Sequence, residues 1–390
     1  MITVDQALAR VLALVTPLSG ESVPLRACAN RVLGEPVRAT RAQPPFPASA
    51  MDGYALRSAE ARPGARFTVI DTAAAGHASL HAVGPGQAIR IFTGAPVPQG
   101  ADRVIIQEDV TRDADTITLN DSLDAGPCIR PAGADFAMGA EWFPRRPLTP
   151  SDLVLIAAMN CAAPVVLRKP VVALIATGDE LVMPGESPRD DQIIASNTFG
   201  LAAMVEQAGG IARILPIARD NESALRTAFG LTQGADLIVT IGGASVGDHD
   251  LVGRVAGDLG MQRAFYKIAM RPGKPLMAGR LNGTALLGLP GNPVSSMVCG
   301  HIFMLPALRA MLGLGAVAAP RLSAPLAGDL DGNGAREHYM RATLLDGALH
   351  AAKRQDSALT AVLAEANALI LRPIGDPARK RGDIVTYLPL

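Results

Sequence analysis

The stretch that decides the fold is 170–181, which reads PVVALIATGDEL, an apolar run followed at once by a polar turn that contains a glycine. Such a run is typical of a strand that is buried in a parallel sheet. Similar apolar runs alternate with helix-length segments as far as residue 311. This alternation indicates βαβ units, so we predict a three-layer α/β domain with a mostly parallel sheet over residues 170–312.

The elements expected in this domain follow from the same alternation. We predict strands at 171–176, 211–217, 237–241 and 265–268. We predict helices at 197–207, 222–231, 251–259 and 294–311, with Gly209 and Gly210 ending the first of them.

The residues before this domain fall into two groups. Thr3 and Gln6 form a capping box for a helix over 4–14, and a proline-rich stretch that begins at Pro44 then breaks the pattern. Short strand-like runs at 67–70, 89–92, 104–106 and 117–119 indicate a small β domain over 46–139. Helical spacing resumes over 150–161, with Ser151 or Asp152 as its cap.

We expect the helix at 150–161 to pack on the first helix, so that 1–45 and 140–169 form one N-terminal discontinuous helical and linker domain. The β domain over 46–139 is then an insertion. At the other end, strand-like runs at 339–344, 369–372 and 384–387 predict a C-terminal β-barrel-like domain over 318–390. The whole chain is therefore expected to be a multi-domain α/β protein.

Composition excludes several classes of protein. The chain has 390 residues, of which 49% are hydrophobic, and its 36 basic side chains equal its 36 acidic ones. A balanced charge gives no field that favours nucleic acid or a membrane surface. Four dispersed cysteines form no C-x-x-C pair, which fits a reducing cytoplasm.

The apolar segments also argue against membrane insertion. Asp5, Gln6 and Arg10 interrupt the N-terminal apolar residues, so no signal peptide is expected. The most apolar segment, 293–320, contains His301 and Arg309 and is better explained as a buried helix with a linker.

Ligands of an open parallel sheet bind at the carboxyl ends of its strands. The loop after the first predicted strand reads TGDEL (177–181), and the loop after the third reads GGASVGDHD (242–250). Glycines let backbone N–H groups approach an oxyanion, and a helix N-terminus adds its dipole, so these loops predict a phosphate site. The alternative is a tight strand-to-helix turn that uses the same residues for steric reasons.

Cations follow the last predicted strand. Lys267, Arg271 and Lys274 surround a Pro-Gly turn, and Lys267 and Arg271 share a face if the strand runs that far. We interpret them as a strip that binds a polyanion, against the alternative of a solvated basic edge. The segment 289–296, LPGNPVSS, opens a long helix and supplies further donors or ordinary capping.

Acidic residues in turns form a second set. Hard cations such as Mg²⁺ bind carboxylate oxygens together with substrate phosphates, so carboxylates beside a phosphate site predict a metal site. The alternative for each of them is a solvated turn residue. The candidates are Asp52, Asp135, Glu180, Asp220, Asp248 and Asp250. The six histidines show neither a zinc nor a catalytic-triad spacing.

Seven ordered motifs are similar to those of a known family. The chain resembles the molybdopterin molybdotransferases, a family related to a domain of the animal protein gephyrin, over nearly its whole length. The motifs lie at 49–54, 93–102, 130–135, 177–181, 242–250, 271–275 and 289–296.

The resemblance implies a reaction, an assembly and partners. It implies Mg²⁺-dependent cleavage of adenylylated molybdopterin with release of AMP, and insertion of molybdate at the pterin dithiolene. It implies a homodimer in which the inserted β domain of one subunit faces the phosphate-binding domain of the other. A molybdopterin adenylyltransferase and chaperones of molybdoenzymes are further expected partners.

The resemblance also implies roles for individual residues. A catalytic role is expected for Asp52, Glu180, Asp220, Asp250, Lys267, Arg271 and Lys274. Binding of the pterin nucleotide is expected at Thr93, Arg130, Asp135, Thr177, Gly178, Gly242, Gly243, Ser245, Gly247, Pro290, Gly291, Asn292, Pro293 and Ser295. The metal would bind Glu180, Asp220, Asp248 and Asp250.

Three positions depart from the family pattern. Arg271 stands where lysine is frequent, Ala244 where valine is common, and 354–357 reads RQDS in place of the usual QGSG. Two other functions stay open. A molybdopterin adenylyltransferase would use ATP and molybdopterin, and a pterin-binding scaffold or carrier would bind the nucleotide without releasing AMP.

Overall fold

The computed structural model describes residues 1–243 and 251–390. The chain forms two compact units, one of residues 1–21, 30–34 and 167–390, and the other of residues 22–29 and 35–166. The short strands β1 (Gly20–Ser22) and β12 (Val165–Leu167) contain two of the boundaries between them.

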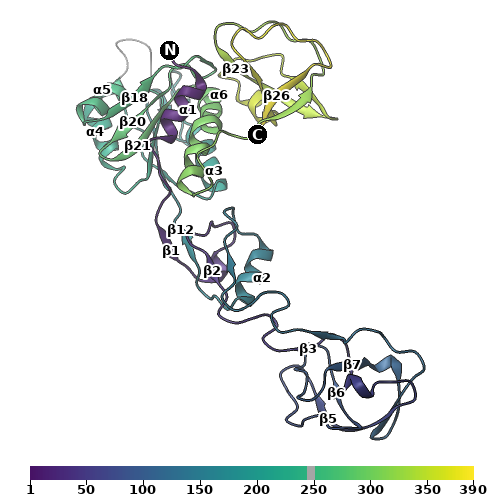
Figure 1. The fold of residues 1–390 in the computed structure, drawn as a ribbon. Helices are drawn as coiled ribbons and strands as arrows, with labels where there is room; N and C mark the ends of the chain where they lie inside the picture. Colours follow the sequence, from purple (N-terminus) through teal and green to yellow (C-terminus); the bar gives the residue numbers. More distant parts are fainter. Residues whose placement is uncertain (244–250) are drawn as a thin grey trace. The chain divides into compact units, whose positions relative to one another are not determined.

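A six-stranded sheet forms the centre of the first unit (Figure 1). The sheet order is β16 (Ile211–Ile214), β13 (Val171–Ala176), β17 (Leu237–Ile241), β21 (Thr284–Leu289), β20 (Met277–Leu281) and β18 (Gln262–Tyr266). The first four strands are parallel, and β20 and β18 are antiparallel to their neighbours. β17 is buried along its whole length, as expected for a strand that is covered on both faces.

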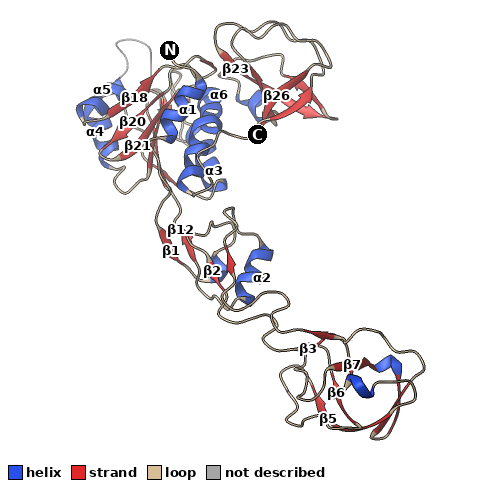
Figure 2. Cartoon of the chain, viewed as in Figure 1, coloured by secondary structure: helices blue, strands red, loops and turns tan. Residues whose placement is uncertain are grey.

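Helices cover both faces of this sheet, so the three-layer prediction is confirmed (Figure 2). One face carries α1 (Val4–Leu12), α3 (Asn197–Gln207) and a long helix made of α6 (Pro293–Cys299), a π-helical turn (Gly300–Met304) and α7 (Leu305–Met311). The other face carries α4 (Glu222–Gly230) and α5 (Leu251–Asp258). The long helix spans 19 residues and is 78% buried inside the protein, as expected of a core helix.

The sequence missed one hairpin of the sheet. β20 and β21 are joined at Asn282 and Gly283, which both have a positive φ, 49° and 85°. A two-residue Asn-Gly loop is a strong hairpin signal. The prediction of 265–268 as the next strand after β17 is therefore wrong in register and place, since β18 is an antiparallel edge strand that ends at Tyr266.

The first helix belongs to the α/β unit. Thr3 and Gln6 form the predicted capping box, and the apolar face of α1, with Val4, Leu8 and Val11, is buried in the core of the sheet. The prediction that the helix at 150–161 packs on this helix is therefore wrong, because the sheet already covers the apolar face of α1. Four of the nine residues of α1 are buried, and their helical spacing forms this apolar face.

The C-terminal part of the first unit is a β domain. Its sheet runs β19 (Met270–Arg271), β23 (Glu337–Leu345), β25 (Ala368–Arg372), β26 (Ile384–Pro389) and β22 (Leu322–Pro325), with β24 (Ala348–Ala351) paired to β23. α8 (Thr360–Ala364) precedes β25. The predicted strands at 339–344, 369–372 and 384–387 are confirmed. β19 belongs to this sheet although it lies between α5 and β20 in the sequence, so strand pairing joins the two domains.

The second unit contains the inserted β domain. Its sheet order is β7 (Arg103–Ile106), β4 (Gly53–Leu56), β6 (Gln87–Ile91), β5 (Arg66–Ala73), β9 (Thr116–Leu119) and β8 (Val110–Asp113). Two short pairs lie outside this sheet, β3 (Ala48–Ser49) with β10 (Ile129–Arg130), and β2 (Val37–Arg38) with β11 (Glu141–Trp142). The predicted strands of the inserted domain are confirmed.

The helix α2 (Pro150–Ala158) of this unit begins before its predicted cap. Thr149 is the N-cap and accepts a hydrogen bond from the backbone N–H of Asp152. Asp152 is instead the third helical residue and closes a capping box on Thr149. The choice of Ser151 or Asp152 as cap is therefore wrong, because Pro150 already takes the first helical position.

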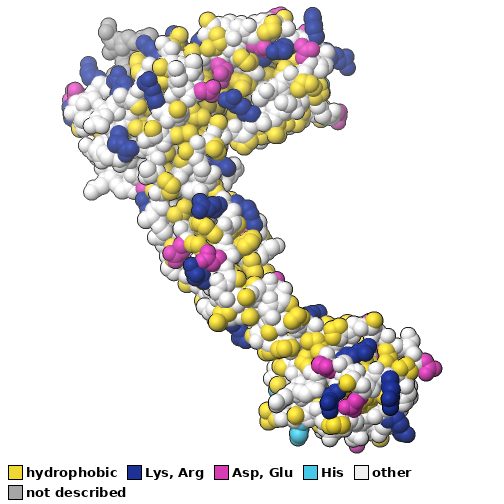
Figure 3. All heavy atoms as spheres, viewed as in Figure 1, with side chains coloured by type: hydrophobic (Ala, Val, Ile, Leu, Met, Phe, Trp, Pro, Cys, Tyr) yellow, Lys and Arg dark blue, Asp and Glu magenta, His cyan; other side chains and the backbone are white. Residues whose placement is uncertain are grey.

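Charged side chains of both signs are mixed on the visible face of the molecule, in line with the equal numbers of basic and acidic residues (Figure 3). The four cysteines are free thiols, and Cys28 and Cys299 are buried.

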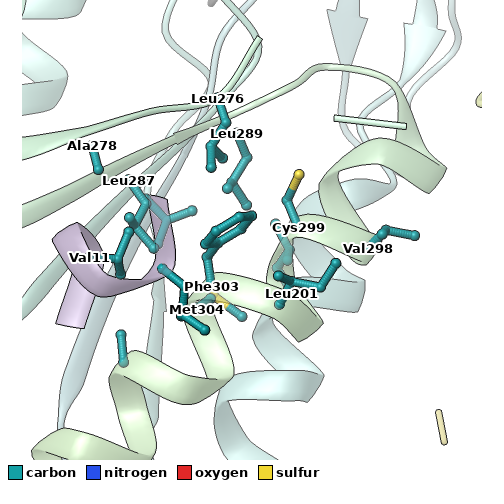
Figure 4. Close-up of a cluster of buried hydrophobic side chains, with 14 of the residues drawn as sticks. Val11, Leu201, Leu276, Ala278, Leu287, Leu289, Val298, Cys299, Phe303 and Met304 are labelled. Carbon is teal, nitrogen blue, oxygen red and sulfur yellow. The ribbon is translucent and has the colours of Figure 1, made fainter. Parts of the chain in front are cut away.

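The core of the α/β domain generates the first prediction. Phe303 is fully buried among side chains that include Leu276 and Leu289 (Figure 4). Phe303→Ala should lower the free energy of unfolding by about 3–5 kcal/mol, since it removes contacts and leaves a cavity. Phe199→Ala is the matched control, because Phe199 is 44% exposed, and it should change stability by less than about 0.5 kcal/mol.

The measurement is denaturant unfolding followed by circular dichroism. Equal losses of stability in the two variants would contradict the assignment of Phe303 to the core.

Candidate functional site

The register of three parallel strands brings three loops to one edge of the sheet. Ala176 pairs with Ile241, and Ile241 pairs with Leu289, so β13, β17 and β21 end together. The ladder continues for one more residue, because the N–H of Thr177 donates to Ile241 O (3.0 Å) and the N–H of Gly242 donates to Leu289 O (3.0 Å). The loops that begin at Thr177, Gly242 and Pro290 therefore start side by side, as the sequence predicted for the first two.

A cavity of about 680 Å³ opens at this edge, and we call it the nucleotide cavity after the ligand that the sequence leads us to expect here. Ten of the predicted site residues line it, namely Thr177, Gly178, Glu180, Asp220, Gly242, Gly243, Pro290, Gly291, Asn292 and Pro293. Ser245, Gly247, Asp248 and Asp250, which were also predicted, lie outside the described residues. Ser295 is buried in α6 and does not line the cavity.

Two glycines of this site cannot be replaced without a shift of their neighbours. Gly242 has a φ of 95°, and a Cβ atom there would lie 2.8 Å from Thr177 O. Gly243 has a φ of 65°, and its Cβ would lie 2.1 Å from Cγ2 of Val252. Both positions require a left-handed backbone and the absence of a side chain. Steric reasons therefore explain both glycines. The absence of a side chain also leaves their backbone open to a ligand.

Two helix N-termini face the same cavity. α3 begins at Asn197 and α6 at Pro293, and the residues that start both helices line the cavity. Neither N-cap side chain, Ser196 or Asn292, caps its own helix by a hydrogen bond. The side-chain amide of Asn197 instead donates to Gly291 O at 2.6 Å and ties the two loops together. The dipoles of the two helices make this wall suited to a phosphate.

Carboxylates bring negative charge to the same cavity. Burial raises the pKa of Asp220, and the negative charges of Asp179 and Glu180 raise it further. Asp179 also accepts a hydrogen bond from the N–H of Asp220, at 3.0 Å. Arg219 holds the turn by donating to the carbonyls of Asp179 (2.9 Å) and Leu181 (3.1 Å).

The lining of the nucleotide cavity contains no Lys, Arg or His among the described residues. The same part of the chain holds no group of three His, Cys, Asp or Glu side chains with metal-binding geometry. Glu180 and Asp220 are thus the two described members of the predicted metal set, and Asp248 and Asp250 fall in 244–250.

The three cations of the predicted basic strip do not share a strand. β18 ends at Tyr266, and Lys267 has a φ of 66° that turns the chain and places its ammonium over the Tyr266 ring. Arg271 lies in β19 and pairs with His338 of the C-terminal sheet. The expectation that Lys267 and Arg271 share a face is therefore wrong, because the left-handed residue ends the strand between them. Lys267 and Lys274 line neither the nucleotide cavity nor the second cavity, to which Arg271 belongs.

Arg271 instead lines a second cavity of about 490 Å³ between β19 and the C-terminal domain. We call it the basic groove and define it by Arg271, His338, Lys353, Gln355 and Arg372, all of which line it. Asp329 and Asp331 also line this groove. Neither Arg271 nor Lys353 has an ion-pair partner among the residues that the structure describes.

His338 shows how positive this groove is. Its side chain is 7% exposed, and burial together with the charges of Arg271, Arg372, Arg341 and Arg336 lowers its pKa to about 4. The imidazole is therefore neutral at neutral pH. Arg372 is bonded to Asp376 and to the carbonyls of Asp331 and Pro377, which leaves Arg271 and Lys353 as the cations of the groove without an ion-pair partner among the described residues.

The predicted residues of the second unit are held by local contacts within that unit. Oδ1 of Asp52 accepts from the N–H (2.8 Å) and the hydroxyl (2.7 Å) of Thr93, and these bonds lower the pKa of Asp52. Arg130 lies in β10, opposite Ala48. The N–H of Asp135 donates to Gln43 O at 2.9 Å. Asp52 is thus ionised and held in one orientation.

Comparison with known proteins identifies the family. Three family models match in order: "MoeA N-terminal region (domain I and II)" at residues 2–160, "Probable molybdopterin binding domain" at 173–310 and "MoeA C-terminal region (domain IV)" at 323–390. The molybdopterin molybdenumtransferase of Nostoc sp. is 34% identical over 386 residues, which are 95% of this chain and 88% of that protein. The chain belongs to the molybdopterin molybdenumtransferase family.

Other relatives agree with this assignment. The molybdopterin molybdenumtransferase of Haemophilus influenzae is 36% identical over 317 residues, covering 80% of this chain and 78% of that protein. The crystal structure of a molybdopterin biosynthesis MoeA protein from Pyrococcus horikosii has a TM-score of 0.89 at 27% identity and covers 100% of this chain and 99% of its own. The protein is therefore a transferase by family, with the fold of that structure.

Sequence reasoning missed part of the lining of the nucleotide cavity. Leu181, Ile193 and Ile194 form an apolar wall of the nucleotide cavity on the short strands β14 (Leu181–Val182) and β15 (Ile193–Ile194). Ser196 and Asn197 were missed too, although Ser-Asn before an apolar periodic run is a helix-start signal. Ala358 could not have been found from sequence, since it comes from the C-terminal domain.

The carboxylates generate the second prediction. Glu180→Gln should lower the pKa of Asp220, because it removes one of the two negative charges that raise it. The pKa should stay above the ordinary aspartate value, since burial is its largest cause. A carbon-13 NMR titration of labelled aspartate carboxyls measures this. Glu206→Gln, on the exposed side of α3, is the control and should leave the Asp220 titration unchanged.

An unaltered Asp220 titration in Glu180→Gln would show that the two carboxylates are not electrostatic neighbours.

Proposed function

We propose that this protein is a molybdopterin molybdotransferase, which cleaves adenylylated molybdopterin, releases AMP and inserts molybdate at the pterin dithiolene. The observation that carries the proposal is the nucleotide cavity, which two helix N-termini and glycine loops line within the segment matched by the molybdopterin-binding model. Relatives along most of the chain are named for this transfer.

The two walls of the nucleotide cavity suit the two ends of the substrate. The starts of α3 and α6 offer their dipoles to phosphate oxygens, and Gly243, which has no side chain, lets the backbone approach them. Leu181, Ile193 and Ile194 offer an apolar surface to a ring system. A pterin nucleotide carries both features, and a phosphate alone would leave the apolar wall unused.

The carboxylates of this cavity fit a magnesium ion. Asp179 and Glu180 raise the pKa of Asp220, because their negative charges lie close to its carboxylate. Glu180 and Asp220 would hold the ion, together with Asp248 and Asp250 of the segment 244–250. When bound, Mg²⁺ would neutralise charge on the phosphoanhydride. The residues of the chain would place the anhydride beside these carboxylates.

The oxyanion fits the basic groove. Arg271 and Lys353 have no ion-pair partner there, and neutral His338 adds a hydrogen-bond donor or acceptor beside them. A planar guanidinium at position 271 binds two oxygens of a tetrahedral oxyanion at once, which an ammonium does not. Lys267 and Lys274 belong to the same turn and would add to its positive potential.

The remaining predicted residues support a homodimer. In our proposal Asp52, Thr93, Arg130 and Asp135 of the partner subunit complete the site, and Asp52 is prepared for this by its two hydrogen bonds from Thr93. A molybdopterin adenylyltransferase that delivers the nucleotide and chaperones of molybdoenzymes that accept the product are the protein partners. The cytoplasm is the proposed compartment.

The third prediction tests the reaction itself. The purified protein is incubated with adenylylated molybdopterin, Mg²⁺ and molybdate, and AMP is measured by chromatography. We expect AMP release that depends on molybdate and on Mg²⁺. Nucleotide binding without AMP release would support a scaffold or carrier, and turnover of ATP with molybdopterin would support an adenylyltransferase. Replacement of molybdate by tungstate shows which oxyanion the site prefers.

The fourth prediction separates function from folding at Asp220. Asp220→Asn should lower AMP release by roughly tenfold to a hundredfold, since it removes a proposed metal ligand. It should not lower the melting temperature. The folded state raises the pKa of Asp220, so its charge destabilises the fold above that pKa and this penalty disappears below it. Asp190→Asn, at an exposed loop position, is the control and should change neither quantity.

Full activity of Asp220→Asn would contradict the role of this carboxylate.

The fifth prediction concerns Arg271. Arg271→Ala should raise the molybdate concentration for half-maximal AMP release by roughly tenfold or more, because it removes a bidentate charge. Lys169→Ala is the control, since Lys169 is exposed and lines neither cavity. An unchanged molybdate dependence in Arg271→Ala would place the oxyanion outside the basic groove.

A further inference from the structure

A short segment of the C-terminal domain lies between the two cavities. Residues 355–359, which we call the clasp, follow β24 and precede α8. Gln355 at its start lines the basic groove, and Ala358, three residues later, lines the nucleotide cavity. The clasp is therefore a wall that both cavities share.

One end of the clasp is fixed to the C-terminal sheet by the side chain of Gln355. Its Oε1 accepts from the N–H of Arg341 (3.0 Å), and its Nε2 donates to the carbonyls of Arg341 (2.9 Å) and Ala352 (2.9 Å). The amide thus bonds to β23 in the way that a neighbouring strand would. Arg341 is fully buried, so this anchor point does not move with solvent-exposed groups.

The other end is fixed to the start of α6. Ser357 O accepts from the N–H of Val294 at 3.1 Å, which satisfies a donor in the first turn of the helix. The hydroxyl of Ser357 accepts from the amide of Asn292 at 2.9 Å. Between the two ends, Asp356 accepts from the N–H of Ala358 at 2.8 Å and makes a tight turn. Three residues therefore connect β23 to a loop of the nucleotide cavity.

We propose that Gln355 is a positioning residue, which holds the clasp so that an oxyanion in the basic groove is presented to the nucleotide in the neighbouring cavity. The inference rests on the proposed function, because it assigns the oxyanion to one cavity and the nucleotide to the other. Gln355 touches neither reacting group. It sets the place of Ser357 and Ala358, and through Val294 it links the groove to the start of α6.

A second side-chain amide that bonds to β23 provides a matched control. The amide of Asn367 accepts from the N–H of Leu344 (2.7 Å) and donates to Leu344 O (3.2 Å), so it makes the same kind of two-way bond to β23. Asn367 is exposed and lines neither cavity. Variants at either position therefore lose side-chain amide bonds to β23. Only Gln355 lines the basic groove.

The test is AMP release by the full-length protein as a function of molybdate and, separately, of adenylylated molybdopterin. Gln355→Ala should raise the half-saturating molybdate concentration by roughly tenfold, as expected for a residue that supports a ligand-binding group. The half-saturating nucleotide concentration should stay within about twofold of the wild type. Asn367→Ala should change neither value.

Gln355→Glu is the second variant, because it keeps the size and the Oε1 acceptor but loses both Nε2 donor bonds, and it should shift the molybdate dependence in the same direction. Hydrogen exchange of the Val294 amide, measured by mass spectrometry, should be faster in both Gln355 variants and unchanged in Asn367→Ala.

Two results would overturn the inference. The first is an unchanged molybdate dependence in both Gln355 variants, and the second is an equal rise in the two half-saturating concentrations, as a general loss of structure would give. Either result leaves the proposed function standing as long as the wild type releases AMP with molybdate. A wild type without AMP release would instead refute the proposed function.

Discussion

The site depends on the common end point of three parallel strands. The pairings of Ala176 with Ile241 and of Ile241 with Leu289 place the loops that follow β13, β17 and β21 at one edge. A shift of one residue in either pairing would turn alternate side chains to the other face and separate these loops. The buried apolar side chains of the strands enforce the register, so the core of the sheet and the geometry of the cavity have one cause.

Charge is distributed unevenly over this frame. The nucleotide cavity holds carboxylates and helix N-termini, and Arg271 and Lys353 lie instead in the basic groove. β19 explains the separation, because it leaves the α/β sheet and pairs with β23, and it carries Arg271 into the C-terminal domain. The clasp then crosses back from β23 to the start of α6. The C-terminal domain therefore contributes lining residues to both cavities.

Much of the fold could be predicted from local pattern. The apolar runs at 171–176 and 237–241, the capping box of Thr3 and Gln6 and the glycines after α3 each act within a few residues, and each prediction was confirmed. The errors came from tertiary context. The left-handed φ of Lys267 separates it from Arg271, and the burial of α1 on the sheet prevents a helix pair that its pattern also permits. Ala358 and Gln355 reach the cavities only through strand pairing distant in sequence.

The most direct test of this account is a crystal structure of the full-length protein with adenylylated molybdopterin. The account predicts the nucleotide at the carboxyl edge of the parallel sheet, with phosphate oxygens within hydrogen-bond distance of the N–H groups that begin α3 or α6. It also predicts the ring system against Leu181, Ile193 and Ile194. A nucleotide bound in the basic groove, or elsewhere on the chain with the strand-edge cavity empty, would contradict it.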